Sequence, residues 1–387
     1  MDLVVTSLEA WDTVWRRNQH LVAGLLRRDP SLRVLFVEPA TDPLHSGLGG
    51  GLPRRGRGLR AHEGDGIPPG ALWLLEPTKW LPRRVDRSVD ERWARLVART
   101  ARGLGMSDPA LWVNDPRGAL LVEATTWRSL YDVTDDWTLA DRPAVEIARL
   151  RSQESVLLSR CEEVVVCSPA LARSKGTDRE VTLVPNGVDT QAYAVRHDRP
   201  ADLPDGVVVL YAGTLHGDRL DVAICVAVAE SLTARGRLVL LGPDALAPAD
   251  TERLEQTGVV VLGARPSAEV PAYLQHADVL VVPHVVTPFT DSLDPIKLYE
   301  YQAAGRPVVS TPVAGFRDTT DNRVTVTDDH GFVAAVGDLV DHVRADAVAT
   351  RPGAATVDAG LAEIDWSHRV VQMADVLARL DTSPAPR

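Results

Sequence analysis

The segment that begins DPIKLYEY at Asp294 combines a lysine and a glutamate in a pattern typical of an anion-binding helix. Pro295 is typical of a first helical turn, Asp294 of the N-cap before it, and Lys297 then lies within that turn. A lysine there opposes the helix dipole, so a bound anion would explain its presence. Glu300 follows on a neighbouring part of the same helix face. The alternative is a solvated Lys and Glu pair, which is common on helix surfaces.

A second candidate anion site follows the apolar run VVVLYA. Gly213 would allow close approach of the backbone, and Arg219 would supply positive charge near the start of the next helix. A plain turn with a surface arginine is the alternative. The loop lacks the GxGxxG pattern of dinucleotide-binding proteins. His284 follows the run DVLVVP and is expected at the end of another strand.

Short β-branched apolar runs alternate with helical stretches along the chain, among them residues 13–28 and 295–304. This alternation is typical of parallel sheets covered by crossover helices, so we predict an α/β fold with two doubly wound domains. Residues 193–206 break the pattern with prolines and charges, which places the domain boundary near residue 200. Ligands bind beyond the carboxyl ends of parallel strands, so we expect the site in a cleft between the domains.

The composition is that of a folded, water-soluble protein, with 387 residues, 45% apolar and 25% charged. The net charge of −11 disfavours nucleic-acid binding. Cys161, Cys167 and Cys225 have no metal-ligand spacing and suggest a reducing compartment. No apolar run approaches the length that spans a bilayer, so we predict a cytoplasmic protein.

Residues 43–70 are rich in Gly, Pro and Arg, and we predict a long mobile loop there. Its arginines could meet an anionic acceptor, such as a lipid diphosphate, with peripheral contact to a membrane. A solvated lid is the alternative. Basic residues are otherwise almost all arginine, and the chain has only three lysines: Lys79, Lys175 and Lys297.

Two segments resemble GT-B glycosyltransferases of the family 4 type, in particular bacterial transferases that build cell-surface polysaccharides such as teichuronic acid. LVPNGVD, residues 183–189, is similar to the family's domain-junction motif, and residues 277–311 are similar to its donor-binding core. The resemblance implies two Rossmann-like domains facing across a cleft, with residues 1–198 on the acceptor side and residues 199–365 binding the nucleotide sugar. It also implies that a terminal helix, residues 366–387, returns to the first domain.

The family's donor motif is a pair of glutamates, the second of which holds the ribose hydroxyls. Glu300 matches that second position, and Ser292 stands at the first. The family also directs two cations at the diphosphate from the first loop of its second domain; here Thr214 replaces one and Arg219 takes the other. We expect Lys297 to replace the missing cation, helped by the amides of residues 294–296.

The resemblance implies further contacts. From YDVTDDW, Asp135 and Asp136 would lie near the transferred sugar, where either could bind it or deprotonate the acceptor. Helix capping is the alternative for one of them, and a metal site with Asp132 is not expected. The remaining expected substrate-binding residues are Gly213, His284, Leu293, Asp294, Pro295 and Ile296 for the donor, Ala264 and Arg265 for its base, and Arg16 and His20 in the first domain.

The implied function is transfer of a sugar from a UDP, GDP or dTDP sugar to an acceptor hydroxyl on a polysaccharide, a lipid-linked precursor or a natural product. The resemblance implies no metal, no other cofactor and retention of the anomeric configuration. One alternative is a nucleotide-sugar epimerase of the same fold. Another is a catalytically silent nucleotide-binding subunit. The oligomeric state is left open.

Overall fold

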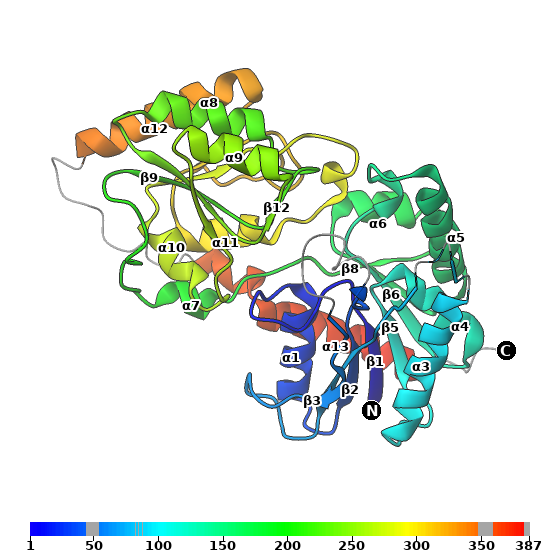
Figure 1. Cartoon of the computed structure of the whole chain (residues 1–387). Coiled ribbons are helices and arrows are strands. Elements are labelled where there is room, and N and C mark those ends of the chain that lie inside the picture. The colour runs from blue at the N-terminus through cyan, green and yellow to red at the C-terminus, as the bar shows by residue number, and fades with distance from the viewer. Residues whose placement is uncertain (44–53, 82, 84, 87, 347–358, 383–387) are drawn as a thin grey trace. The chain divides into compact units, whose positions relative to one another are not determined.

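The apolar runs form two separate sheets, one in each of two units of the chain (Figure 1). The computed structural model describes residues 1–43, 54–81, 83, 85–86, 88–346 and 359–382.

Unit 1 consists of Met1–Asp12, Arg16–Pro185 and the chain from Arg369 onward, and unit 2 of Thr13–Trp15 and Asn186–His368. The main passage between the units falls at Pro185 and Asn186, so residues 193–206 lie inside unit 2.

Unit 1 is built on an eight-stranded sheet with the order β3-β4-β2-β1-β5-β6-β7-β8. All neighbouring strands are parallel except β3 and β4. The strands are β1 (Asp2–Thr6), β2 (Arg33–Val37), β3 (Gly58–Ala61), β4 (Leu72–Glu76), β5 (Ala110–Val113), β6 (Ser129–Val133), β7 (Glu163–Val166) and β8 (Thr182–Leu183).

Helices cover this sheet because each presents an apolar stripe to it. Gly24 of α1 lies against Val370 of α13, so these two helices pack closely together, as Figure 1 also shows. The helices are α1 (Arg17–Arg28), α3 (Val89–Gly103), α4 (Ala119–Ala124), α5 (Ala144–Arg160), α6 (Pro169–Lys175) and α13 (Trp366–Thr382).

The prediction of one long loop over residues 43–70 is wrong in part. Residues 58–61 form β3, an edge strand that pairs antiparallel with β4. Arg57 and Arg54 donate to Glu76, and Arg60 donates to Glu38, so buried carboxylates on the neighbouring strands hold this segment. Residues 44–53 lie outside the described residues.

Unit 2 is built on a parallel sheet of six strands with the order β13-β11-β9-β14-β15-β16. Its strands are β9 (Val208–Ala212), β11 (Arg237–Leu241), β13 (Val260–Gly263), β14 (Val279–Val282), β15 (Val308–Ser310) and β16 (Val324–Val326). Its helices are α7 (Thr190–Ala194), α8 (Val222–Leu232), α9 (Pro248–Gln256), α10 (Val270–His276), α11 (Ile296–Ala304) and α12 (Asp329–Asp346).

Successive residues of β9 belong to different cores. Val208 and Leu210 join the cluster that contains α10 and α11, whereas Val209 and Tyr211 join the cluster that contains α8 and α12. Because side chains alternate along a strand, the two helix layers cover opposite faces of the sheet. In Figure 1, α8 and α12 lie side by side, as do α10 and α11. The predicted α/β class with parallel-sheet cores is confirmed.

Candidate functional site

The candidate site of unit 2 lies where β9 and β14 end. These strands are neighbours in the parallel sheet, so their carboxyl ends and the loops that follow are adjacent. Gly213 directly follows β9, and His284 follows β14 with one residue between them. Lys297 in the first turn of α11 reaches this edge, because its Nζ atom is 2.9 Å from the position a Cβ on Gly213 would take.

Three side chains contact one another here. Lys297 Nζ donates to the Tyr211 hydroxyl at 2.7 Å and lies 3.2 Å from His284 Nε2. The hydroxyl is 3.0 Å from the same ring nitrogen. The lysine also stands over the aromatic ring, with Nζ 4.0 Å from the ring centroid. The arrangement therefore fixes the amine at the carboxyl edge of the sheet.

Lys297 differs from the other lysines of the chain in its partners. Lys79 pairs with Asp42 at 2.8 Å, and Lys175 pairs with Asp136 and Glu154 at 2.8 and 2.9 Å. Within the described residues, Lys297 has no carboxylate within the 4.0 Å of an ion pair. Its bonding partners are a hydroxyl and an imidazole, both uncharged.

Burial and neighbouring charges shift the pKa values of three side chains in this site. Burial, with the positive charge of Arg219, lowers the pKa of Lys297 to about 7. The same environment lowers the pKa of His284 well below its ordinary value, chiefly through burial and then through Lys297, so the imidazole is neutral. Burial raises the pKa of Glu300 to about 7. The site therefore holds weakly compensated positive charge and would be stabilised by an anion.

Gly213 is required at its position. Its φ of 142° is one that side-chain-bearing residues rarely adopt, and its amide donates to the Leu241 carbonyl at 2.8 Å. A Cβ there would also stand 3.2 Å from the Tyr211 hydroxyl. In the same loop, the backbone carbonyl of Thr214 accepts a hydrogen bond from His216 N at 3.1 Å.

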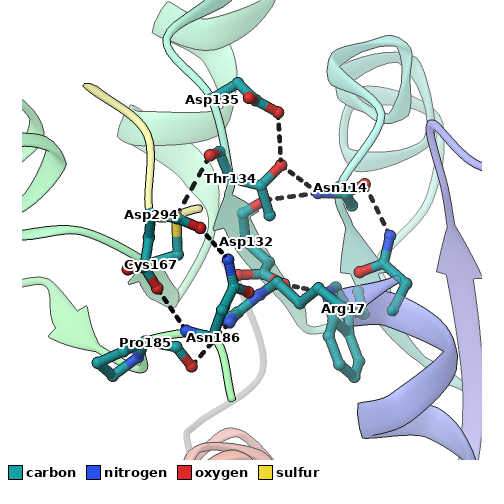
Figure 2. Close-up of polar contacts among 11 residues, drawn as sticks. Arg17, Asn114, Asp132, Thr134, Asp135, Cys167, Pro185, Asn186 and Asp294 are labelled. Atoms are coloured by element: carbon teal, nitrogen blue, oxygen red, sulfur yellow. Dashed lines mark hydrogen bonds and ion pairs between the residues drawn. The ribbon is translucent and has the colours of Figure 1, made fainter. Parts of the chain in front are cut away.

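The prediction that Asp294 caps α11 is wrong. The helix begins at Ile296 with Pro295 as its N-cap, and no side chain among the described residues caps it. The Asp294 carboxylate instead accepts from the Asn186 amide at 2.5 Å and the Tyr299 hydroxyl at 2.8 Å. Figure 2 shows Asn186 bonded to Asp294. The LVPNGVD motif is thus tied to the donor segment within unit 2, while the first turn of α11 keeps its amides uncapped by side chains.

Other predicted donor residues have structural partners. Ser292 is buried, and its hydroxyl donates to Phe289 O at 2.7 Å inside the short turn that Leu293 follows. Ala264 is exposed after β13. The guanidinium of Arg265 donates to Asp202, Tyr273 and two carbonyls of its own loop, which makes it a brace of that loop.

In unit 1, the two aspartates of YDVTDDW have different surroundings. Asp136 caps the short helix Trp137–Leu139 by accepting from Thr138 N, and it pairs with Lys175 at 2.8 Å, so the capping alternative holds for this residue. Asp135 accepts from the Thr134 hydroxyl at 3.2 Å (Figure 2). The carboxylate of Asp136 is therefore committed to structure, and that of Asp135 is the better candidate for a ligand.

Asp132 is part of a buried network in the same unit. Arg17 donates to both of its oxygens, at 3.2 and 3.0 Å (Figure 2). Trp112 Nε1 donates to the same carboxylate at 3.2 Å. Because both oxygens of this carboxylate already accept hydrogen bonds, we do not expect it to bind a metal cation. Within the described residues, no group of three or more His, Cys, Asp or Glu side chains could hold a metal ion.

The predicted residues of the first loop lie at the start of α1. The helix begins at Arg17, four residues later than predicted, because residues 13–15 belong with unit 2 and Thr13 accepts from Ser267. Arg16 is its N-cap residue, and its side chain lies 3.7 Å from Asp12. His20 is half-buried on this helix.

The structure thus brings together Gly213, His284 and Lys297, with Arg219 and Glu300 close enough to affect the charge of the lysine. Sequence reasoning missed Tyr211 and Asn186. Tyr211 carries the one hydrogen-bonding side chain of VVVLYAG, directly before the turn, and that position was a usable signal. Asn186 gave no signal beyond its place in a motif.

Residues 206–345 match the family model of the glycosyl transferases group 1. The predicted family resemblance is confirmed, and the matched segment includes the whole lysine site. A curated relative is the putative teichuronic acid biosynthesis glycosyltransferase TuaH of Bacillus subtilis, 26% identical over an alignment of 223 residues that covers 52% of this chain. The chain spans 55% of the length of that relative.

Solved structures match over nearly the whole chain. Sucrose-phosphate synthase from Thermosynechococcus elongatus has a TM-score of 0.69 at 18% identity, with 99% of this chain and 100% of that one covered. HepE from Anabaena, in complex with UDP and glucose, has a TM-score of 0.66 at 16% identity, with 97% and 99% covered. Similarity at this level shows the fold, and the predicted GT-B fold is confirmed. None of the helices in the described part of the chain is long and apolar enough to cross a membrane.

Proposed function

We propose that this protein transfers a sugar from a nucleoside diphosphate sugar to an acceptor hydroxyl. The observation that carries the proposal is Lys297, a lysine without a carboxylate partner among the described residues, at the carboxyl edge of the sheet in a glycosyl transferases group 1 domain. A site with unbalanced positive charge and helix amides suits a diphosphate.

The chemistry that such a site would perform is stabilisation of the leaving group. Cleavage of the sugar–phosphate bond builds negative charge on the diphosphate while the sugar carbon becomes cationic. Lys297, Arg219 and the first amides of α11 would stabilise that charge, and each preorganised donor of this kind is worth about 3–4 kcal/mol. Glu300, one turn along α11, would hold the ribose hydroxyls.

Among the nucleotides, UDP is our first choice. The Anabaena protein of the same fold was solved with UDP and glucose. TuaH is described by its role in teichuronic acid biosynthesis, which supports a glycan or lipid-linked acceptor for this chain as well. GDP and dTDP sugars, and a natural-product acceptor, are the competing choices that a binding screen would compare.

In unit 1, Asp135 is our choice for the contact with the sugar or the acceptor, because Asp136 is committed to Lys175 and to a helix cap. We further propose that transfer needs no metal and retains the anomeric configuration. Activity that survives a chelator, and a product whose anomeric proton keeps the coupling of the donor in NMR, are the expected results.

We also propose a cytoplasmic protein with at most peripheral membrane contact. Of the arginine-rich segment, Arg54, Arg57 and Arg60 are paired with Glu38 and Glu76, so these three are not expected to bind lipid phosphates. Vesicles that contain anionic lipid would test the contact, because unchanged sedimentation of the protein with them would exclude it.

The test of the function compares Lys297→Met with Lys79→Met. The first replaces an amine that has no carboxylate partner among the described residues with an apolar chain of similar length, and the second removes a lysine that is paired with Asp42 in unit 1. With a UDP sugar and a glycan acceptor, the first variant should lose activity by about a hundredfold or more, in line with the loss of a preorganised charge donor, and the second should keep it.

Two other outcomes would replace the proposal. Epimerisation of a UDP sugar in the absence of acceptor would indicate an epimerase, although none of the matched proteins named above is one. Nucleotide binding without any turnover would indicate the silent subunit. Wild-type activity in Lys297→Met would remove the lysine from the mechanism.

A further inference from the structure

The partners of Lys297 are unusual for a lysine that is held in place. A carboxylate partner, as Lys79 and Lys175 have, stabilises only the charged ammonium. A hydroxyl and a neutral imidazole can each either donate or accept a hydrogen bond. Tyr211 and His284 can therefore hold the lysine nitrogen both as an ammonium, which only donates, and as an amine, which also accepts.

The ring of Tyr211 and the turn at Gly213 restrict where that nitrogen can go. Nζ is 4.0 Å from the ring centroid and 2.9 Å from the Cβ position above Gly213. Tyr211 is fully buried, and burial raises the pKa of its hydroxyl, so the ring does not supply a negative charge. The contacts of the amine with the Tyr211 ring and hydroxyl and with His284 therefore do not depend on a charged partner.

The charged and titratable groups that face Lys297 come from four elements. Tyr211 is the penultimate residue of β9, Arg219 precedes α8, His284 follows β14, and Glu300 lies on α11 itself. With His284 neutral, a charged Lys297 is disfavoured by Arg219 and favoured by Glu300, and the negative charge of a bound diphosphate would favour it further.

We propose that above neutral pH Lys297 is an uncharged amine in the empty site and takes up one proton at Nζ when the diphosphate of the donor binds, with Tyr211 and His284 as positioning residues in both states. The inference rests on the proposed function. The proton comes from solvent, forms an N–H bond on the amine, and returns to solvent when the nucleoside diphosphate leaves. Donor binding is thereby coupled to pH.

The sign of the coupling follows from the groups involved. The pKa of Lys297 lies at about 7, so the free amine dominates above that pH and each binding event must then supply a proton. Glu300, whose pKa also lies at about 7, is already ionised there. Affinity for UDP should therefore fall as the pH rises above about 7, approaching tenfold per pH unit.

The experiment is calorimetric titration of UDP into the full chain at about pH 8, in two buffers of different ionisation enthalpy. The difference in heat gives the protons taken up, and we expect close to one per UDP. Lys297→Met should bind more weakly with no uptake. Glu300→Gln and His284→Gln should keep the uptake, which assigns the proton to the lysine. Tyr211→Phe keeps the ring and removes the hydroxyl, and it should move the pH at which affinity falls to a lower value.

The outcomes separate the two proposals. If UDP, GDP and dTDP all fail to bind, the proposed function falls and this inference falls with it. If UDP binds with equal heats in both buffers, or if uptake persists in Lys297→Met, the function stands and the inference is overturned. Should Lys297→Met not fold, a wild-type affinity that does not change between about pH 7.5 and 8.5 overturns it equally.

Discussion

Gly213→Ala tests the geometry around Lys297 by adding a single methyl group. The new Cβ would stand 2.9 Å from Lys297 Nζ, 3.3 Å from its Cε and 3.2 Å from the Tyr211 hydroxyl. The lysine end is flexible and must yield. The φ of 142° is in addition strained for alanine, at a cost of about 1–3 kcal/mol in the free energy of unfolding.

The displaced amine should weaken nucleotide binding. A charge-assisted hydrogen bond contributes about 1.5–3 kcal/mol, so partial loss of about 1–2 kcal/mol gives roughly 5- to 30-fold weaker binding of UDP. Gly217→Ala is the matched control, because it lies in the same loop with open space around it and should change neither property. Calorimetry and thermal melting measure both. Equal UDP affinity in the two variants would refute the placement of the diphosphate at Lys297.

Three further predictions concern side chains of known burial. Asp136→Asn should lower the free energy of unfolding by about 2–3 kcal/mol because it weakens a buried pair with Lys175, whereas Asp135→Asn should reduce transfer with an unchanged melting curve. Reduced transfer with an unchanged melting curve in Asp136→Asn, and lost stability in Asp135→Asn, would contradict this assignment. Arg17→Met leaves a fully buried carboxylate without its cation and should cost about 3–5 kcal/mol in urea unfolding; a cost under about 1 kcal/mol would contradict a structural role. Glu300→Gln should weaken UDP binding roughly tenfold at about pH 8 and much less at about pH 6, since burial raises the pKa of this carboxyl to about 7; a pH-independent difference would contradict it.

The fold was predictable because it rests on local patterns. Runs such as VVVLYA and DVLVVP are too apolar to lie anywhere but inside a covered sheet, and they form β9 and β14. The strand β3 was not predictable, because GLRA has no such run. Arg57 and Arg60 hold it by pairing with the buried carboxylates of Glu76 in β4 and of Glu38 just after β2, and such long-range pairs leave no periodicity in the sequence.

The candidate site was predictable in part for the same reason. Lys297 could be found from its position at a helix start, which is a local property. The position of Tyr211 near a strand end was a signal, but its hydrogen bond with Lys297 joins residues 86 positions apart and could not be predicted from a local pattern. The local capping rule failed at Asp294 because its carboxylate accepts instead from the backbone amide of Asn186, 108 positions away. The roles given to the remaining site residues are predictions for experiment.

The central claim is that a nucleoside diphosphate binds at Lys297 in unit 2. The most direct measurement is a crystal structure of the protein with UDP, or with GDP or dTDP if either binds more tightly. We predict diphosphate oxygens within hydrogen-bonding distance of Lys297 Nζ and ribose hydroxyls at Glu300. A nucleotide bound elsewhere, for example in the cavity lined by Asp202 and Tyr273, with Lys297 still in contact only with Tyr211 and His284, would contradict the account.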